Sequence, residues 1–161
     1  MRVYRYLNEQ ELNTILRGDV SSLGHEFHKD RKNYLNSHHY KKGVKYMHFF
    51  KNFEDMQEIK QVYQNVKGKF YYCSFDIPRL VLFFAAGKGF YAPKGYDYDF
   101  SVMTEYAIRT DKFNPQWLHS YSLDKDREKP KRVKSSVIPV EENHKKAPQT
   151  KVQVQDKEKT R

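Results

Sequence analysis

The sequence predicts an α+β domain in which strands outnumber helices. Four short segments, residues 2–7, 44–50, 69–77 and 104–110, have the alternation or the aromatic and β-branched content of strands. Two segments early in the chain carry apolar side chains at helical spacing. Aromatic residues make up 16% of the chain, with 13 Tyr and 11 Phe, although its mean hydropathy is −0.96. A core built from large amphipathic rings suits a sheet better than a helical bundle.

The chain opens with a strand that leads directly into a helix. Residues 2–7 (Arg-Val-Tyr-Arg-Tyr-Leu) alternate in the manner of a strand. Asn8 can cap a helix over residues 9–16, and Glu11 stands three residues further on, as in a capping box. Gly18 is a residue at which this helix can end. The apolar stripe of the helix consists of Leu12, Ile15 and Leu16.

A long polar loop separates this first pair from a second strand and helix. Residues 19–43 show no sustained period and include four histidines, so we expect a loop with one helical turn near residues 29–34. A loop of this length in a small domain is often functional. Residues 44–50 predict the second strand, and Asn52 can cap a second helix over residues 53–63.

The second half of the chain predicts further strands and a closing segment. Pro78 ends a third strand over residues 69–77. The apolar segment 79–86 is compatible with either a helix or a strand. Another strand spans residues 104–110, and the segment 111–123 carries Phe113, Trp117 and Leu118, which we expect to close the core.

Composition divides the chain into a domain and a tail. Residues 124–161 contain no aromatic residue and no glycine, so they cannot bury enough apolar surface to offset their ordering entropy. We therefore expect one domain over residues 1–123 and a basic, disordered tail over residues 124–161. The net charge of +10 is shared between them, since the tail has 12 Lys and Arg against 7 Asp and Glu, and the body has 18 against 13.

Composition also excludes several classes of protein. No apolar run approaches the roughly 20 residues of a membrane helix, and the N-terminus has no signal-peptide core. We expect a cytoplasmic protein without a membrane segment. Cys73 is the only cysteine, so it forms no internal disulfide and begins no zinc-finger spacing. The carboxylates stand at no ligand spacing to the histidines, and we expect no metal.

Three separated blocks of the sequence resemble one known family. The first joins the strand at residues 3–6 (Val-Tyr-Arg-Tyr) to the helix at residues 9–16. The second is residues 43–50 (Gly-Val-Lys-Tyr-Met-His-Phe-Phe) with the helix that follows. The third and most specific is residues 104–109 (Thr-Glu-Tyr-Ala-Ile-Arg) followed by residues 113–118 (Phe-Asn-Pro-Gln-Trp-Leu). In content and order these blocks are similar to the ADP-ribosyltransferase superfamily, particularly its small diphtheria-toxin-like and poly(ADP-ribose) polymerase-like members.

This resemblance implies a split, strongly bent sheet that binds nicotinamide adenine dinucleotide (NAD) as a substrate. Glu105 takes the place of the family's catalytic glutamate, whose carboxylate would stabilise the positive charge that develops as nicotinamide leaves. Arg5 takes the place of the residue that contacts the ribose or the phosphates, and Tyr46 that of a tyrosine that stacks on nicotinamide. His48 lies on the same strand as Tyr46 and can donate a hydrogen bond to the substrate.

The sequence also departs from the family's patterns. The strand around His48 has none of the hydroxyls of a Ser-Thr-Ser motif. Arg5 stands where polymerase-like members have histidine, and Met103 stands where arginine-specific members have a second glutamate. We therefore do not expect arginine-specific modification.

Two classes of function remain open at this point. The first is an enzyme that cleaves the nicotinamide–ribose bond and transfers ADP-ribose to water or to an acceptor, for which the basic charge favours a nucleic acid or an acidic protein. The second is a non-catalytic α+β module that binds a nucleic acid or a partner protein through a basic, aromatic-rich surface. If Glu105 faces bulk solvent, as most strand carboxylates do, the enzymatic interpretation fails. The basic residues interleaved with aromatic ones are Lys41, Lys42, Lys45 and Lys51.

Overall fold

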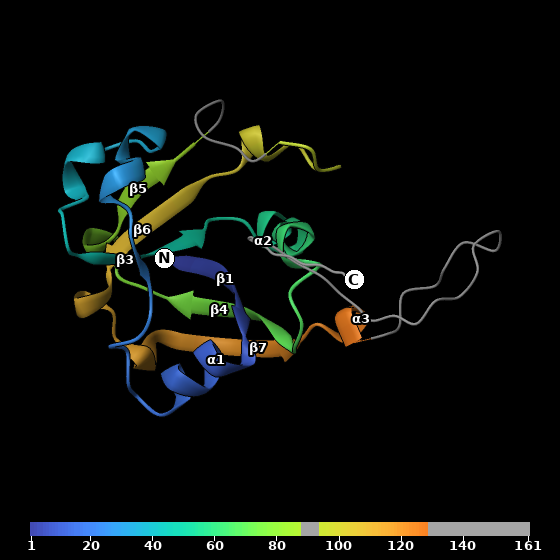
Figure 1. Cartoon of the computed structure of the whole chain (residues 1–161). Helices are drawn as coiled ribbons and strands as arrows, with labels where there is room; N and C mark the ends of the chain where they lie inside the picture. Colours follow the sequence, from blue (N-terminus) through green and yellow to red (C-terminus); the bar gives the residue numbers. More distant parts are fainter. Residues whose placement is uncertain (88–93, 129–161) are drawn as a thin grey trace.

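The computed structural model describes residues 1–87 and 94–128, and it is an α+β fold around an open sheet of seven strands (Figure 1). The strand order is β5-β6-β3-β1-β4-β7, with the short β2 paired to β3, and each described pair is antiparallel. The strands are β1 (Arg2–Asn8), β2 (His25–Glu26), β3 (Lys45–Phe50), β4 (Phe70–Asp76), β5 (Phe83–Ala86), β6 (Glu105–Arg109) and β7 (Leu118–Leu123). The α-helices are α1 (Glu9–Leu16), α2 (Phe53–Ile59) and α3 (Lys125–Glu128).

The predicted α+β class and the four predicted strands are confirmed as β1, β3, β4 and β6. The ambiguous segment 79–86 contains a 3₁₀ turn followed by β5. The second helix ends at Ile59 and continues as a 3₁₀ turn over Lys60–Tyr63. The sequence did not predict β2 or β7, because both are largely exposed and lack a buried alternate face. Residues 88–93 and 129–161, with most of the predicted tail, lie outside the described residues.

The sheet is divided between β1 and β3. These neighbours pair at one position, Tyr4 with Phe50, whereas β1 pairs with β4 at every position from Arg2 to Asn8. In Figure 1, β5 and β6 lie above β3, and β4 and β7 lie below β1. The two halves therefore diverge from a narrow junction, and the divergence leaves room for side chains between them.

The two longer helices cover opposite faces of the sheet. Leu12 and Ile15 of α1 pack with Val3 of β1, whereas Met56 of α2 packs with Tyr6. Because successive side chains of a strand point to opposite faces, β1 contributes to both clusters. Figure 1 shows α1 beside the lower half of the sheet and α2 beside the junction of β1 and β3.

The predicted helix start at Asn8 is present in full. Its side-chain oxygen accepts a hydrogen bond from the Glu11 backbone nitrogen at 2.8 Å, and the Glu11 carboxylate accepts one from the Asn8 backbone nitrogen at 3.1 Å. This capping box satisfies two backbone donors that would otherwise have no partner at the first turn. It also fixes the direction in which α1 leaves the end of β1.

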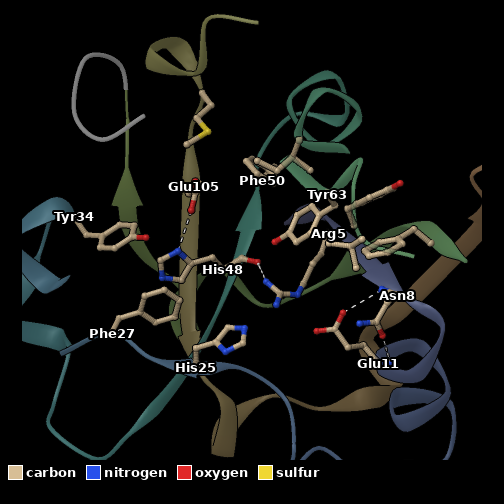
Figure 2. Close-up of a pocket in the computed structure, with 15 residues that line it drawn as sticks. Arg5, Asn8, Glu11, His25, Phe27, Tyr34, His48, Phe50, Tyr63 and Glu105 are labelled. Carbon is tan, nitrogen blue, oxygen red and sulfur yellow. Dashed lines mark hydrogen bonds and ion pairs between the residues drawn. The ribbon is translucent and has the colours of Figure 1, made fainter. Parts of the chain in front are cut away.

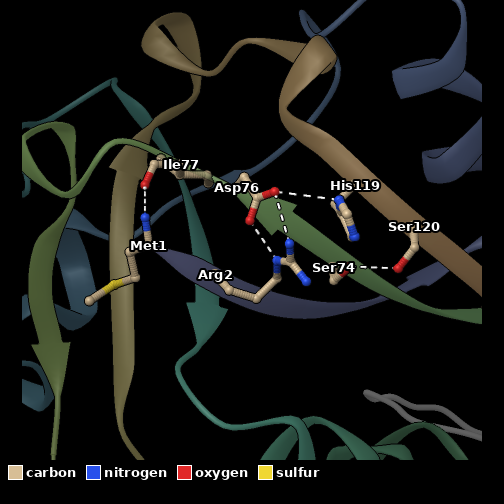
Figure 3. Close-up of polar contacts among 7 residues, drawn as sticks. All are labelled: Met1, Arg2, Ser74, Asp76, Ile77, His119 and Ser120. Carbon is tan, nitrogen blue, oxygen red and sulfur yellow. Dashed lines mark hydrogen bonds and ion pairs between the residues drawn. The ribbon is translucent and has the colours of Figure 1, made fainter.

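Polar contacts across β1, β4 and β7 align the lower half of the sheet (Figure 3). The guanidinium of Arg2 donates to both oxygens of Asp76, and this ion pair lowers the pKa of Asp76. Ser74 and Ser120 share a hydrogen bond of 2.6 Å between their hydroxyls. The exposed ion pair adds little stability, whereas the Ser74–Ser120 bond joins β4 to the edge strand β7, which has few buried side chains.

Packed structure continues past residue 123. Asp124 is 3% exposed and accepts a hydrogen bond of 2.8 Å from the Tyr6 hydroxyl. Arg127 of α3 lies over the Phe70 ring at 4.1 Å and donates to the carbonyl oxygen of Gly68. Composition did not indicate these contacts, because they are made by charged residues that bind partners on the sheet.

Within residues 1–87 and 94–128, every helix is too short or too polar to cross a membrane.

Candidate functional site

A cavity of about 480 Å³ opens where the two halves of the sheet diverge (Figure 2). Its wall is mostly aromatic and aliphatic, with a few polar groups that converge on it, as is typical of ligand sites. The volume lies within the roughly 300–1,000 Å³ range of small-molecule pockets. Three of the four residues expected at the active site line it, namely Arg5, His48 and Glu105.

Glu105 is the first residue of β6 and lies opposite Phe50 of β3. The residue is 7% exposed, and its Oε1 atom lies 2.9 Å from Nδ1 of His48. The pairing of β5 with β6 shifts register between Phe84 and Ala86, and Ala86 is the partner of Glu105. Such irregularities at an edge strand can redirect a side chain. The carboxylate therefore lines the cavity and does not face bulk solvent.

His48 is held on both ring nitrogens and on a ring face. Its Nε2 atom lies 2.9 Å from the Tyr40 hydroxyl, and Nδ1 contacts Glu105. Phe27 stacks on the imidazole with centroids 4.3 Å apart and planes at 15°, and the edge of Tyr34 contacts it at 4.8 Å and 90°. These contacts fix the ring in one orientation.

Arg5 bridges the two halves of the sheet. Its Nη1 atom donates to the carbonyl oxygen of His48 at 2.6 Å, across the gap where β1 and β3 no longer pair. Its guanidinium carbon lies 5.9 Å from the centre of the Phe49 ring. The Nε atom is buried and has no hydrogen-bond partner among the described residues. A guanidinium has five N–H donors, so Arg5 retains the capacity to bind an anion in the cavity.

Tyr46 does not line the cavity. The residue is 1% exposed, and its hydroxyl donates to the carbonyl oxygen of His39 and accepts from the backbone nitrogen of Lys41. The rings of Tyr40 and Phe83 cover it, with centroids 4.9 and 6.0 Å away. Tyr46 shares a strand face with His48, but the segment that follows β2 closes over it. Its ring is therefore not available to stack on a ligand in this arrangement.

Two of the aromatic rings that line the cavity come from the long loop, whereas the others come from β1, β3, β4 and the 3₁₀ turn after α2, namely Tyr6, Phe50, Phe70 and Tyr63. Phe27 and Tyr34 flank the imidazole from residues 19–43, and His25 of β2 stands beside them (Figure 2). Residues 19–43 show no periodicity from which these three positions could be singled out. The length of this loop and its four histidines were the available signals, and both indicated the loop as a whole rather than single positions.

The four lysines proposed for nucleic-acid contact are all exposed. The rings between and beside them are buried, since Tyr40, Tyr46, Phe49 and Phe50 are each at most 9% exposed. The surface therefore offers positive charge without the stacking platforms that single-strand binding uses. The lysines concerned are Lys41, Lys42, Lys45 and Lys51.

The polar groups of the cavity carry charge of both signs. Arg5 supplies a permanent positive charge, and Glu105 and Glu11 supply carboxylates. Among the residues that the structure describes, no three His, Cys, Asp or Glu side chains are grouped so that they could hold a metal ion. Comparison of the chain with protein-family models, with curated proteins and with solved structures gives no match. Function is therefore argued from the site, because a fold alone does not define it.

Proposed function

We propose that the protein cleaves the bond between nicotinamide and ribose in NAD and transfers the ADP-ribose to an acceptor, in the manner of an ADP-ribosyltransferase. The observation that carries this proposal is the convergence of Glu105, His48 and Arg5 on one cavity at the division of the sheet. The three residues come from three different strands, β6, β3 and β1. The resemblance implies a site shared by Arg5, Tyr46 and Glu105; Arg5 and Glu105 line this cavity, whereas Tyr46 does not.

The chemistry needs a carboxylate more than it needs a nucleophile. As the C–N bond breaks, its electron pair leaves with nicotinamide, which becomes neutral, and positive charge develops on the ribose. Glu105 can accept a hydrogen bond from the ribose 2′-hydroxyl and so stabilise that charge. The acceptor oxygen or nitrogen then bonds to the ribose carbon and releases its proton to Glu105 or to water. The low exposure of the site strengthens this electrostatic effect.

The rest of the cavity suits the remainder of the dinucleotide. Arg5 lines the cavity and has N–H donors besides the one that bonds to His48, and these can donate to the diphosphate. The apolar wall, which includes Phe27 and Phe70, offers flat surfaces against which the nicotinamide or adenine ring can pack. Burial of the reacting bond among these rings would also exclude water.

The acceptor is proposed on charge alone. A chain with a net charge of +10 attracts acidic partners, and nucleic acids and acidic proteins are both of this kind. A non-catalytic module that binds such partners is the alternative function. It has weaker support, because the aromatic rings beside the exposed lysines are buried.

The test is nicotinamide release from NAD by the wild-type protein and by Glu105→Gln, with RNA, DNA and protein lysate as acceptors. The amide keeps the size of the side chain but removes its charge, so we expect release to fall by about 10²- to 10³-fold. Glu54→Gln is the matched control, because Glu54 is exposed on α2. Thermal unfolding should show that both variants fold. Equal release by wild type and Glu105→Gln, or no release by folded wild type, would refute the proposal.

A further inference from the structure

A chain of hydrogen bonds leads from Glu105 away from the cavity. Oε1 of Glu105 lies 2.9 Å from Nδ1 of His48, and Nε2 of His48 lies 2.9 Å from the hydroxyl of Tyr40. Glu105 and His48 line the cavity, whereas Tyr40 does not. Tyr40 is only 2% exposed and lies in the segment that closes over β3. The sequence indicated Tyr40 only as one of the aromatic residues interleaved with the lysines, and the resemblance assigned it no role.

We infer that Tyr40 and His48 are positioning residues for Glu105. The Tyr40 hydroxyl donates a hydrogen bond to Nε2 of His48, which places the hydrogen of the neutral imidazole on Nδ1. This hydrogen is donated to Oε1 of Glu105 and holds the carboxylate so that Oε2 faces the substrate. The inference rests on the proposed function, because it concerns the same carboxylate. It gives His48 a role different from the substrate contact expected from the sequence.

The direction of each hydrogen bond follows from what the groups can donate. An ionised carboxylate only accepts, so Nδ1 of His48 must carry a hydrogen to bond with Glu105. A neutral imidazole has one N–H, so Nε2 must then accept, and the Tyr40 hydroxyl is its donor. Burial raises the pKa of Tyr40, so the hydroxyl keeps its hydrogen.

The packing holds both residues in this geometry. Tyr46 and Phe83 contact the Tyr40 ring edge-on at 4.9 and 5.3 Å, which sets where its hydroxyl points. Phe27 lies flat on the imidazole. Rotation of the His48 ring would therefore break two hydrogen bonds and a stacked contact together.

Polar and charged groups approach the imidazole of His48 from several strands. On the β6 side stands Glu105, and Arg5 of β1 donates to the His48 carbonyl oxygen. His25 of β2 lines the same cavity, and Tyr34 contacts the ring edge. The hydrogen on Nδ1 is shared by both protonation states, so the hold on Glu105 does not depend on which one dominates.

The first test is the position of the hydrogen on His48 in the full chain. Nitrogen NMR of protein with labelled histidine distinguishes Nδ1–H from Nε2–H, and the signals of His48 are those lost in His48→Asn. We expect Nδ1–H at about pH 8, with a shift of the Nε2 signal in Tyr40→Phe because its donor is gone. An Nε2–H tautomer, or a signal unchanged by Tyr40→Phe, would overturn the inference.

The second test separates positioning from folding in nicotinamide release. Loss of one neutral hydrogen bond in Tyr40→Phe should lower kcat about 2- to 10-fold with little change in KM. Loss of the bond to a charged carboxylate in His48→Ala should lower kcat about 10- to 100-fold. His48→Asn should recover most of that loss, because the amide nitrogen of Asn can stand where Nδ1 stood.

Tyr71→Phe serves as the control, because Tyr71 lies on β4 outside the cavity and should keep wild-type kcat. A folded His48→Asn as slow as His48→Ala, or changes confined to KM, would overturn the inference. The two proposals fail separately. Folded wild type that releases no nicotinamide refutes the proposed function, whereas the NMR experiment decides the arrangement of Tyr40, His48 and Glu105 whether or not there is turnover.

Discussion

Gly24 is the position at which a single methyl group should do most damage to the wall of the cavity. It stands directly before β2, at φ +79°, and a Cβ built there would lie 2.8 Å from the carbonyl oxygen of Tyr46 and 2.2 Å from Oγ1 of Thr110. The first of these neighbours is backbone and cannot rotate away. Gly43 has nearly the same backbone angle, φ +75°, but nothing lies within 4 Å of its Cβ position. Alanine substitutions at Gly24 and Gly43 therefore separate the cost of backbone strain, which both share, from the cost of steric crowding, which only Gly24 has.

The expected losses follow from those two terms. A left-handed conformation costs a residue with a Cβ about 1–2 kcal/mol, and we expect Gly43→Ala to lose about that amount of unfolding free energy. Gly24→Ala should lose a further 1–3 kcal/mol, roughly, because overpacking forces backbone to move. The movement would separate β2 from β3 and shift Phe27, which follows β2 and stacks on His48.

Urea unfolding of the two variants and the wild type measures this difference, with free energies extrapolated to water. Nicotinamide release by folded Gly24→Ala should also fall, whereas Gly43→Ala should keep it. Equal losses of stability in the two variants would show that the close approach of Gly24 to β3 is not a constraint on the fold.

Three further predictions concern stability and binding. In a double-mutant cycle, Tyr6→Phe and Asp124→Ala should show a coupling of about 1.5–3 kcal/mol, because the two wild-type side chains share a buried hydrogen bond to a charged group. Urea unfolding of the single and double variants measures this coupling, and additive losses of stability would contradict it. Burial raises the pKa of the Cys73 thiol to about 12 from 9.0. As the pH rises, the unfolded chain therefore loses this proton before the folded chain does. The thiol's contribution to the free energy of unfolding is present below about pH 9 and declines as the pH rises toward 12. Unfolding followed from pH 8 to 11 should therefore show a shallower alkaline decline in Cys73→Ala, by up to about 1.4 kcal/mol per pH unit, and identical slopes would count against it. Replacing the four exposed lysines between residues 41 and 51 with alanine should weaken nucleic-acid binding and reduce its salt dependence. The measurement is the binding affinity over a series of salt concentrations, and an unchanged affinity would show that these lysines are not a contact surface.

Local sequence signals predicted the elements that depend on local chemistry. The capping box of Asn8 and Glu11 and the alternation of β1 involve residues a few positions apart, so the printed sequence contains all the groups that take part. The edge strand β7 (Leu-His-Ser-Tyr-Ser-Leu) escaped prediction because its side chains are mostly exposed. It is a strand because it pairs with β4, and that pairing is a property of the assembled sheet.

The candidate site shows the same division. Residue types and the resemblance singled out Arg5, His48 and Glu105, and the sequence alone indicated that a strand carries each of them. The sequence also placed Tyr46 on the same strand as His48, and both lie on β3. The path of residues 19–43 over β3 brings Phe27 and Tyr34 to the cavity and buries Tyr46.

The sequence by itself determined the α+β class, the main strands, the first helix and the residue types available for chemistry. The tertiary structure decided that the sheet divides between β1 and β3, that Glu105 meets His48 from 57 residues away along the chain, and that Tyr40 stands behind them. The physical reason is that strand patterns and caps depend on neighbours in sequence, whereas a cavity is formed by side chains from distant segments. Their convergence is set by strand register and by packing of the whole domain.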